Sequence, residues 1–146
     1  MLNGWTVVAL CIIAMAVYAW ITERRIKMIK RKRFAGRQAI APDAFYDLFY
    51  RESGLSRQAV TRALVDIAGV MELDHERLRP SDELAHELAE IEDPLALDCS
   101  LEEIESYVAG RIGRATAGDK LQHVKTLNDL IVLLAQSEAL SNSENM

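Results

Sequence analysis

The first 22 residues of the chain carry no charged side chain, and no other feature constrains its fold as strongly. A run of this length matches the ~20 apolar residues with which a helix crosses the hydrocarbon core of a bilayer. In lipid the backbone amides have to pair within the segment itself. Residues 1–22 are therefore predicted to form a transmembrane helix.

Charged and aromatic residues flank this run as they flank membrane segments. The next eleven residues, Glu23–Arg33, hold seven Lys or Arg and one acid. The positive-inside rule keeps such a cluster in the cytoplasm, so it predicts a single-pass protein of the inner (cytoplasmic) membrane with its N-terminus outside. The predicted interface residues are the aromatic anchors Trp5, Tyr18 and Trp20 and the bases Arg24, Arg25, Lys27, Lys30, Arg31, Lys32 and Arg33.

Two other interpretations of the apolar run are a cleavable signal peptide and a buried core helix. A signal peptide begins with positive charge and has a shorter apolar core, whereas here the dense basic block follows the run. A stretch of 22 uncharged residues is also too long for a core helix of the small domain that follows. The membrane anchor is the favoured interpretation.

The rest of the chain has the opposite charge. From Phe34 onward there are 21 acids and 10 bases, and 13 of the acids fall within residues 72–105. An acidic surface repels phosphate backbones and attracts basic partners, so a basic protein or a membrane complex is expected and nucleic acid is not. Solubility alone is the other explanation of the acids. The predicted interaction face consists of Asp82, Glu83, Glu87, Glu90 and Glu92.

Apolar residues recur at helical spacing after the basic stretch, and no segment alternates as a strand does. The clearest stripe is Val60, Leu64, Ile67 and Met71, preceded by Ser56 as N-cap. The chain is therefore predicted to be all-α. Helices are expected from Asp43 to before Gly54, from Ser56 to Met71, over 82–91 with Leu84, Leu88 and Ile91 inside, from Ser100 to Ile112, and after a cap formed by Thr126 and Asp129. Residues 113–119 are expected to form a loop.

This pattern predicts four segments. Residues 1–22 are the transmembrane helix, and residues 23–42 are a basic juxtamembrane stretch with a linker. Residues 43–137 form a small helical bundle, and residues 138–146 are a polar tail.

Motifs that carry catalysis or bind metals are missing from the sequence. The seven glycines form neither GxGxxG nor GxxxxGK[ST], and there is no GxSxG elbow or HExxH pair. The cysteines and histidines lack metal-ligand spacing. The chain is therefore predicted to be no enzyme and to bind no metal.

Residues 54–64 resemble the recognition helix of a helix-turn-helix protein, with Ser56, Arg57, Gln58, Thr61 and Arg62 opposite the apolar stripe. Phosphate contacts need a positive surrounding surface, and here the adjoining segment is acidic. A solvated helix face is favoured, and a membrane-bound helix-turn-helix-like regulator is kept as an alternative.

Four short motifs resemble, in order, those of acyl carrier proteins. Ile67–Asp74 is similar to their Leu-Gly-Val-like turn, and Arg77–Leu84 to a loop of the form x-L-x-P-x-D-x-L. Asp98-Cys99-Ser100-Leu101 is similar to the Asp-Ser-Leu that bears their prosthetic arm, and Lys125–Ile131 to the start of their closing helix. The resemblance covers roughly residues 55–135. It implies that the domain is a small acyl-carrier-like bundle with an acidic docking surface.

Ser100 has two interpretations. As the first residue of Ser-Leu-Glu-Glu it is a helix N-cap in a capping box closed by Glu103, which contributes about 1 kcal/mol. The resemblance implies instead that its hydroxyl bears 4′-phosphopantetheine from coenzyme A. The cap is favoured, so the domain is predicted to be a membrane-tethered, non-catalytic interaction or scaffold module without a cofactor. A functional acyl carrier is the alternative.

Overall fold

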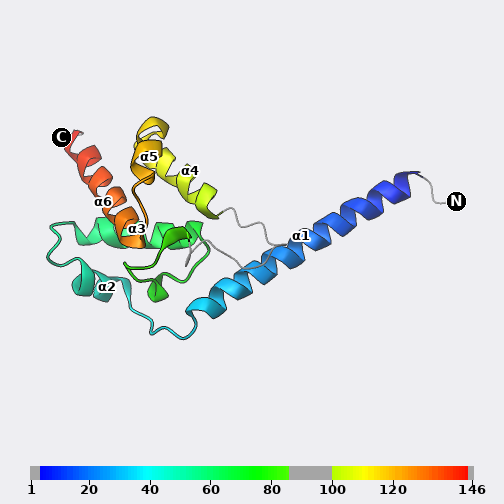
Figure 1. The fold of residues 1–146 in the computed structure, drawn as a ribbon, viewed down its shortest axis with the longest axis horizontal. Coiled ribbons are helices and arrows are strands. Elements are labelled where there is room, and N and C mark those ends of the chain that lie inside the picture. Colours follow the sequence, from blue (N-terminus) through cyan, green and yellow to red (C-terminus); the bar gives the residue numbers. More distant parts are fainter. Residues whose placement is uncertain (1–3, 86–99, 145–146) are drawn as a thin grey trace.

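The computed structural model describes residues 4–85 and 100–144, and these residues are helical apart from turns and loops. One long helix, α1 (Gly4–Phe34), projects from a small helical domain (Figure 1). The domain contains α2 (Pro42–Phe49), α3 (Arg57–Val70), the 3₁₀ turn η1 (His75–Arg77), α4 (Ser100–Ile112), α5 (Arg114–Leu121) and α6 (Leu127–Glu144). Within the described ranges there is no strand, only one antiparallel bridge between Glu83 and Thr126.

Helix α1 confirms the prediction of a long apolar N-terminal helix. It runs without a break through the basic stretch, and it is long and apolar enough to cross a membrane. None of the residues in its most apolar window is buried against protein. At 1.5 Å per residue its 31 residues extend about 46 Å. Only its last turns enter the domain, where Lys30 and Phe34 are buried.

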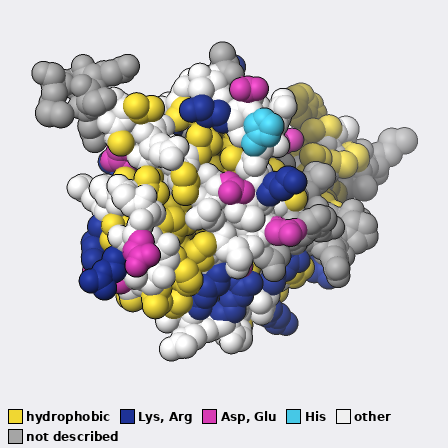
Figure 2. All heavy atoms as spheres, turned by 60° about the vertical axis from the view of Figure 1, so that its left-hand side comes forward, with side chains coloured by type: hydrophobic (Ala, Val, Ile, Leu, Met, Phe, Trp, Pro, Cys, Tyr) yellow, Lys and Arg dark blue, Asp and Glu magenta, His cyan; other side chains and the backbone are white. Residues whose placement is uncertain are grey.

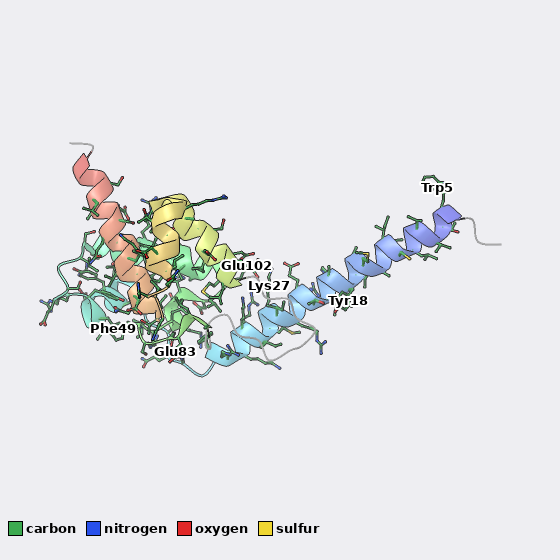
Figure 3. The ribbon with its side chains drawn as sticks, turned by 45° about the horizontal axis from the view of Figure 1, so that its top comes forward. Trp5, Tyr18, Lys27, Phe49, Glu83 and Glu102 are labelled. Atoms are coloured by element: carbon green, nitrogen blue, oxygen red, sulfur yellow. The ribbon has the colours of Figure 1, made fainter. Side chains whose placement is uncertain are left out.

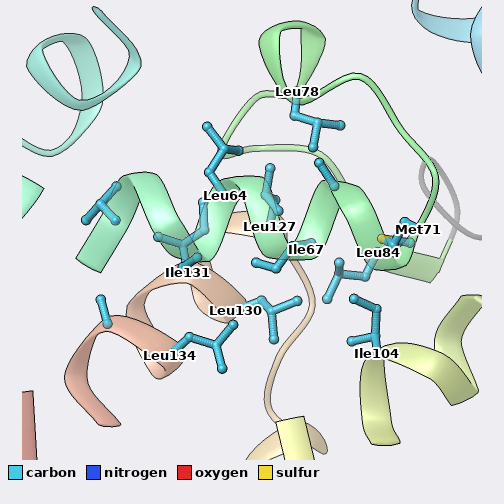
Figure 4. Packing of buried hydrophobic residues seen from close by; sticks show 14 of the residues in the cluster. Leu64, Ile67, Met71, Leu78, Leu84, Ile104, Leu127, Leu130, Ile131 and Leu134 are labelled. Carbon is cyan, nitrogen blue, oxygen red and sulfur yellow. The ribbon is translucent and has the colours of Figure 1, made fainter. Parts of the chain in front are cut away.

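The core of the domain surrounds α3, whose predicted stripe is buried as expected. Leu64 and Ile67 of α3 face Leu130 and Ile131 of α6, as Figure 4 shows, and all four are fully buried. Burying each such side chain contributes about 1.5–3 kcal/mol. Further core residues come from the other elements: Phe45, Leu78, Leu84, Ile104, Val108 and Leu127.

Two of the predicted caps hold the helices that carry this core. The Ser56 hydroxyl accepts a hydrogen bond from the Ala59 amide at 3.1 Å, so it is the N-cap of α3. At the start of α6, the Asp129 carboxylate accepts from the Thr126 amide at 3.0 Å, and the Thr126 hydroxyl accepts from the Asp129 amide at 3.3 Å. This reciprocal arrangement is a capping box.

Helix α5 corrects the prediction of a loop over residues 113–119. Gly113 ends α4 with a left-handed φ of 86°, and a new helix begins at the next residue. Its composition includes Thr116, Gly118 and Asp119, which are weak helix formers. Ala117, at 1% exposed, anchors it in the core, so packing rather than propensity supports this helix.

The helix predicted after Asp43 is shifted and shortened. It begins at Pro42, whose fixed φ suits the first helical position, and it ends at Phe49 rather than near Gly54. Asp43 makes no cap and instead lies in the first turn.

The segments predicted around residue 82 and at the C-terminus also differ from the structure. Asp82 is not helical, because the backbone of residues 82–84 pairs with α6 and the segment before it. Leu84 and Ala85 begin a helical turn, and residues 86–91 of the helix predicted over 82–91, with Leu88 and Ile91, lie outside the described residues. Helix α6 continues to Glu144, through most of the expected polar tail.

Candidate interaction site and helix–domain joint

The residues predicted as a linker are held firmly against the domain. The Arg37 guanidinium binds both carboxylate oxygens of Asp82, at 2.6 and 2.8 Å. The Asp82 side chain is 2% exposed, and it also accepts from the Arg79 amide at 2.8 Å. Asp82 therefore lies beneath the surface and is no part of an exposed interaction face, contrary to the prediction.

Two more arginines tie the end of α1 to the domain. Arg77 donates to the carbonyl oxygens of Phe34, Ala35 and Arg37, at 3.3, 2.7 and 3.0 Å. Arg79 donates to the carbonyl of Gln38. Carbonyls at a helix C-terminus lack partners within the helix and carry partial negative charge, so guanidinium donors stabilise them.

Side chains of α1 complete this contact, which we call the helix–domain joint (Lys30, Phe34, Arg37, Arg77, Arg79 and Asp82). Lys30 is 5% exposed and donates to the carbonyl of Met71, the C-cap of α3, at 3.2 Å. Phe34 packs into the core under the Arg37 guanidinium. One turn earlier, Lys27 forms an ion pair with Glu72 at 3.2 Å. The basic stretch is thus partly structural.

An apolar groove of about 720 Å³ lies on the part of the domain that contains the N-terminal half of α4. Leu101 and Ile104 of α4 line one side, and Leu121 and Val124 line the other. Leu84 also contributes, and its amide donates to the Lys125 carbonyl in the segment before α6. Leu101 is 44% exposed, which is unusual for a leucine beside a core, so the groove leaves apolar surface open to solvent.

Acidic side chains border this groove. Glu83 and Glu105 contribute to its lining together with a single base, Lys125. Glu102 is exposed in the first turn of α4, where the helix dipole favours a carboxylate. Figure 3 shows Glu102 at the end of α4 and Glu83 on the nearby loop. An apolar floor with acidic borders is complementary to a segment that carries apolar and basic residues.

Of the other residues predicted for the interaction face, Glu83 is exposed, as expected. Glu87, Glu90 and Glu92 lie outside the described residues. The groove therefore adds members that the acid pattern alone could not indicate, namely Leu101, Ile104, Glu105, Leu121 and Val124. The sequence predicts Leu101 and Ile104 only as part of the helix from Ser100 to Ile112.

Helix α4 begins at Ser100 itself, so Ser100 is the first helical residue, one position after the N-cap site that the capping motif predicted. Its neighbour Leu101 already lines the groove. A helix N-terminus stabilises an anion through its free amides and its dipole. Elsewhere in the described part of the chain, no three His, Cys, Asp or Glu side chains come together as metal ligands.

The remaining charged residues form small networks rather than a patch of one sign. Arg57 binds Asp47, and Arg62 and Arg111 share Glu138. The face seen in Figure 2 has acidic and basic side chains interspersed among apolar ones. The arginines of the segment that resembles a recognition helix are therefore already paired within the domain.

A partly buried hydrogen bond joins α4 to α3. The Tyr107 hydroxyl donates to the Asp66 carboxylate at 2.7 Å. Burial, together with the hydrogen bond to Asp66, raises the pKa of Tyr107 to about 12, so the phenol stays a donor at neutral pH. This bond fixes the α4 side of the groove against the core.

The predicted membrane-interface residues are spread along α1. Trp5 and Tyr18 lie on the part that extends away from the domain, and Lys27 lies where the helix approaches it (Figure 3). Trp20 stacks under the Arg24 guanidinium, with 4.1 Å between the ring centroid and Cζ. Of the seven bases, Lys27 and Lys30 face the domain, whereas Arg24, Arg25, Arg31, Lys32 and Arg33 are exposed.

No sequence motif indicates that Arg37, Arg77 and Arg79 belong to the helix–domain joint. Their one signal is position: Arg77 and Arg79 are the only bases within the acidic residues 72–105, and they bracket the buried Leu78. Comparison of the chain with protein-family models, with curated proteins and with solved structures finds no match in any of the three.

Proposed function

We propose that this chain is a single-pass protein of the cytoplasmic membrane whose helical domain is a non-catalytic interaction module. The domain is held at the cytoplasmic face by α1 and binds a basic, apolar partner segment in its groove. The observation that carries this proposal is the continuity of α1. An apolar segment in which none of the described residues of the most apolar window is buried leads directly into a joint where Lys30 and Phe34 are buried.

The joint supports a positioning role. A flexible tether would keep the domain near the membrane without orienting it. Here the segment after α1 is bound through Arg37, Arg77 and Arg79, and these hydrogen bonds would restrict the motion of the helix relative to the domain. A partner embedded in the same membrane would then meet the groove in a restricted orientation, which lowers the entropy lost on binding.

The membrane anchor is tested first. Alkaline carbonate should leave the full chain in the membrane pellet, and protease added outside intact cells should spare the C-terminal domain. Release by carbonate would contradict the anchor. Cleavage of the domain from outside would contradict the orientation.

The groove is tested with two model peptides on the full chain in nanodiscs of neutral lipid. One peptide is amphipathic with leucine and lysine, and the other has glutamate in place of lysine. Only the basic peptide should bind, and a combined Leu101→Asn and Glu105→Gln variant should lose most of that binding. Leu48→Asn with Glu52→Gln is the matched control, because both residues are exposed and lie outside the groove. Equal binding of both peptides, or of both variants, would contradict the proposal.

A second candidate is an acyl-carrier-like protein with 4′-phosphopantetheine on Ser100. It is favoured by one observation: α4 begins at Ser100, and the adjoining groove is apolar enough for an acyl chain. The serine hydroxyl would attack the pyrophosphate of coenzyme A on a transferase, form a phosphodiester and release adenosine 3′,5′-bisphosphate.

Intact mass after co-expression with a phosphopantetheinyl transferase distinguishes the two candidates. Addition of one arm that disappears in Ser100→Ala would support the carrier. An unmodified chain, or an equal gain of mass in the Ser100→Ala variant, would contradict the carrier. The interaction module would then be the remaining candidate. The DNA-binding alternative gains no support, because Arg57 and Arg62 already contact carboxylates of the domain.

A further inference from the structure

The cytoplasmic end of α1 has two sides with different surroundings. One side carries Lys27, Lys30 and Phe34, and it contacts the domain. The other carries Arg25 and Lys32, which are two helical turns apart. Arg24 and Arg31 have the same spacing and lie between the two sides, and Arg31 also lines a pocket beside Glu72 and Arg77 of the domain. We call these four residues the basic face.

The basic face is open. All four side chains are exposed, and the described part of the chain offers them no carboxylate partner. Lys27, by contrast, is paired with Glu23 and Glu72. Among the described residues, the acids of the domain therefore pair with one side of the helix and leave the four charges of the basic face without a carboxylate partner.

We infer that the basic face binds the anionic headgroups of a phospholipid surface and sets the direction in which α1 tilts. This inference rests on the proposed membrane anchor. The lipid surface is the favoured occupant, because the face begins immediately after the apolar segment. Trp20, an aromatic side chain suited to the interface, stacks directly on Arg24.

The distances of these bases from the end of the apolar segment agree with binding to a lipid surface. If the hydrocarbon ends near Thr22, Arg24 and Arg25 lie about 3–5 Å beyond it, within a headgroup layer of roughly 5–7 Å. Arg31 and Lys32 lie about 14 Å beyond it, and so within a Debye length of the headgroup surface. Attraction is strongest near the surface, where each base strengthens binding about fivefold.

The consequence concerns the domain. Attraction of the basic face turns that side of α1 toward the membrane when the helix tilts. The joint lies on another side of the helix, so the domain is then held away from the lipid. Its net negative charge, with 21 acids and 10 bases from Phe34 onward, is repelled by the same surface.

The test measures which lipid surrounds Trp20. The chain has two tryptophans, so Trp5→Phe leaves Trp20 as the only one. The full-length variant is reconstituted into symmetric liposomes that contain brominated phosphatidylglycerol or brominated phosphatidylcholine, both of which quench tryptophan. We expect phosphatidylglycerol to be preferred about fivefold or more at low salt. Arg24→Gln with Arg25→Gln should remove most of the preference, and Arg31→Gln with Lys32→Gln a smaller part.

The control is Arg114→Gln with Lys120→Gln, two exposed bases of α5, which lowers the total charge equally. It should keep the preference. Quenching without any preference in the parent protein, or a preference that survives removal of all four charges, would overturn the inference alone. No quenching by either lipid, with protein that does not float with the liposomes, would overturn the membrane anchor and the inference with it.

Discussion

Asp82 is a carboxylate whose two partners both come from arginines. Because its side chain is 2% exposed, removing the Arg37 guanidinium would leave a nearly buried charge with only the Arg79 amide. We expect Arg37→Ala to lower the free energy of unfolding by about 3 kcal/mol. Arg57→Ala removes a guanidinium that is about half exposed, and it should cost less than 1 kcal/mol. Denaturant unfolding of the full chain in micelles compares them, and equal losses would contradict the burial argument.

Asp129 makes the stability of α6 depend on pH. Partial burial alone would raise its pKa, but hydrogen bonds from the amides of Thr126 and Lys125 outweigh burial and lower it below 3.8. A lowered pKa in the folded state means that the stabilisation is complete above about pH 4 and is lost as pH falls through the folded value.

We therefore expect Asp129→Asn to cost about 1 kcal/mol at pH 7 and progressively less in acid. Unfolding midpoints from pH 7 to pH 2 would measure this. Asp119→Asn, at an exposed position in α5, is the control and should show little change. A loss for Asp129→Asn that stays constant across this range would contradict the assignment.

Single residues were partly predictable. Ser56 and the Thr126–Asp129 pair follow local rules of helix capping, so the sequence alone identified them. The burial of Asp82 depends on its ion pair with Arg37, which is 45 residues away in the sequence. No local sequence pattern reveals a contact over that separation. An acid in an acidic stretch was therefore assigned to the surface although it is the centre of the joint.

At the scale of elements, Phe34 belongs to α1 by sequence and to the domain core by packing. We expect Phe34→Ala to cost about 3–5 kcal/mol through the cavity that it leaves. Met28→Ala, on the exposed side of the same helix, should cost far less. Thermal unfolding of the domain in micelles compares the two variants. Similar midpoints would show that α1 is connected to the domain by the chain but does not pack into its core.

The segment after α1 offers a second element to probe. Because Arg37 is bound to Asp82, we expect limited trypsin digestion to cut slowly after Arg37 in the full chain. Asp82→Asn weakens that ion pair and should speed the cut. A parent protein that is cut after Arg37 as fast as the variant would mean that the segment is a flexible linker.

Helices with a strong apolar period, such as α3, were predicted from sequence, whereas α5 and the bound segment after α1 were not. Gly118 and Asp119 suggest a loop, and the helix exists because Ala117 packs in the core. The segment after α1 contains Gly36 and Pro42, which suggest a linker, and its order depends on Arg77 and Arg79. In both, contacts distant in sequence override local preference.

For the molecule as a whole, a continuous α1 that crosses the membrane, as proposed, predicts a definite height of the domain above the membrane. Four alanines inserted after Thr22 should lift the domain by about 6 Å. Energy transfer from a dye on Gln136→Cys, an exposed position of α6, to labelled lipid headgroups would measure the change once Cys11 and Cys99 are replaced by serine. Unchanged transfer would contradict a stiff connection.

The groove could not be predicted from the sequence. Its sides come from a loop, two helices and the segment before α6, and only their assembly leaves Leu101 open. The separation of charge along the chain, with a basic N-terminal stretch and an acidic remainder, is in contrast evident from the sequence alone.

Because α1 is unbroken, a tilt of this helix would also move the domain at its end. If α1 spans a bilayer as proposed and pivots at its midplane, a tilt of about 20°, the average for membrane helices, would displace the joint sideways by about 10 Å. Bilayer thickness sets such tilts, and a flexible hinge would absorb them before they reached the domain. Because this chain has the joint in place of a hinge, the groove would shift with the thickness of the membrane around it.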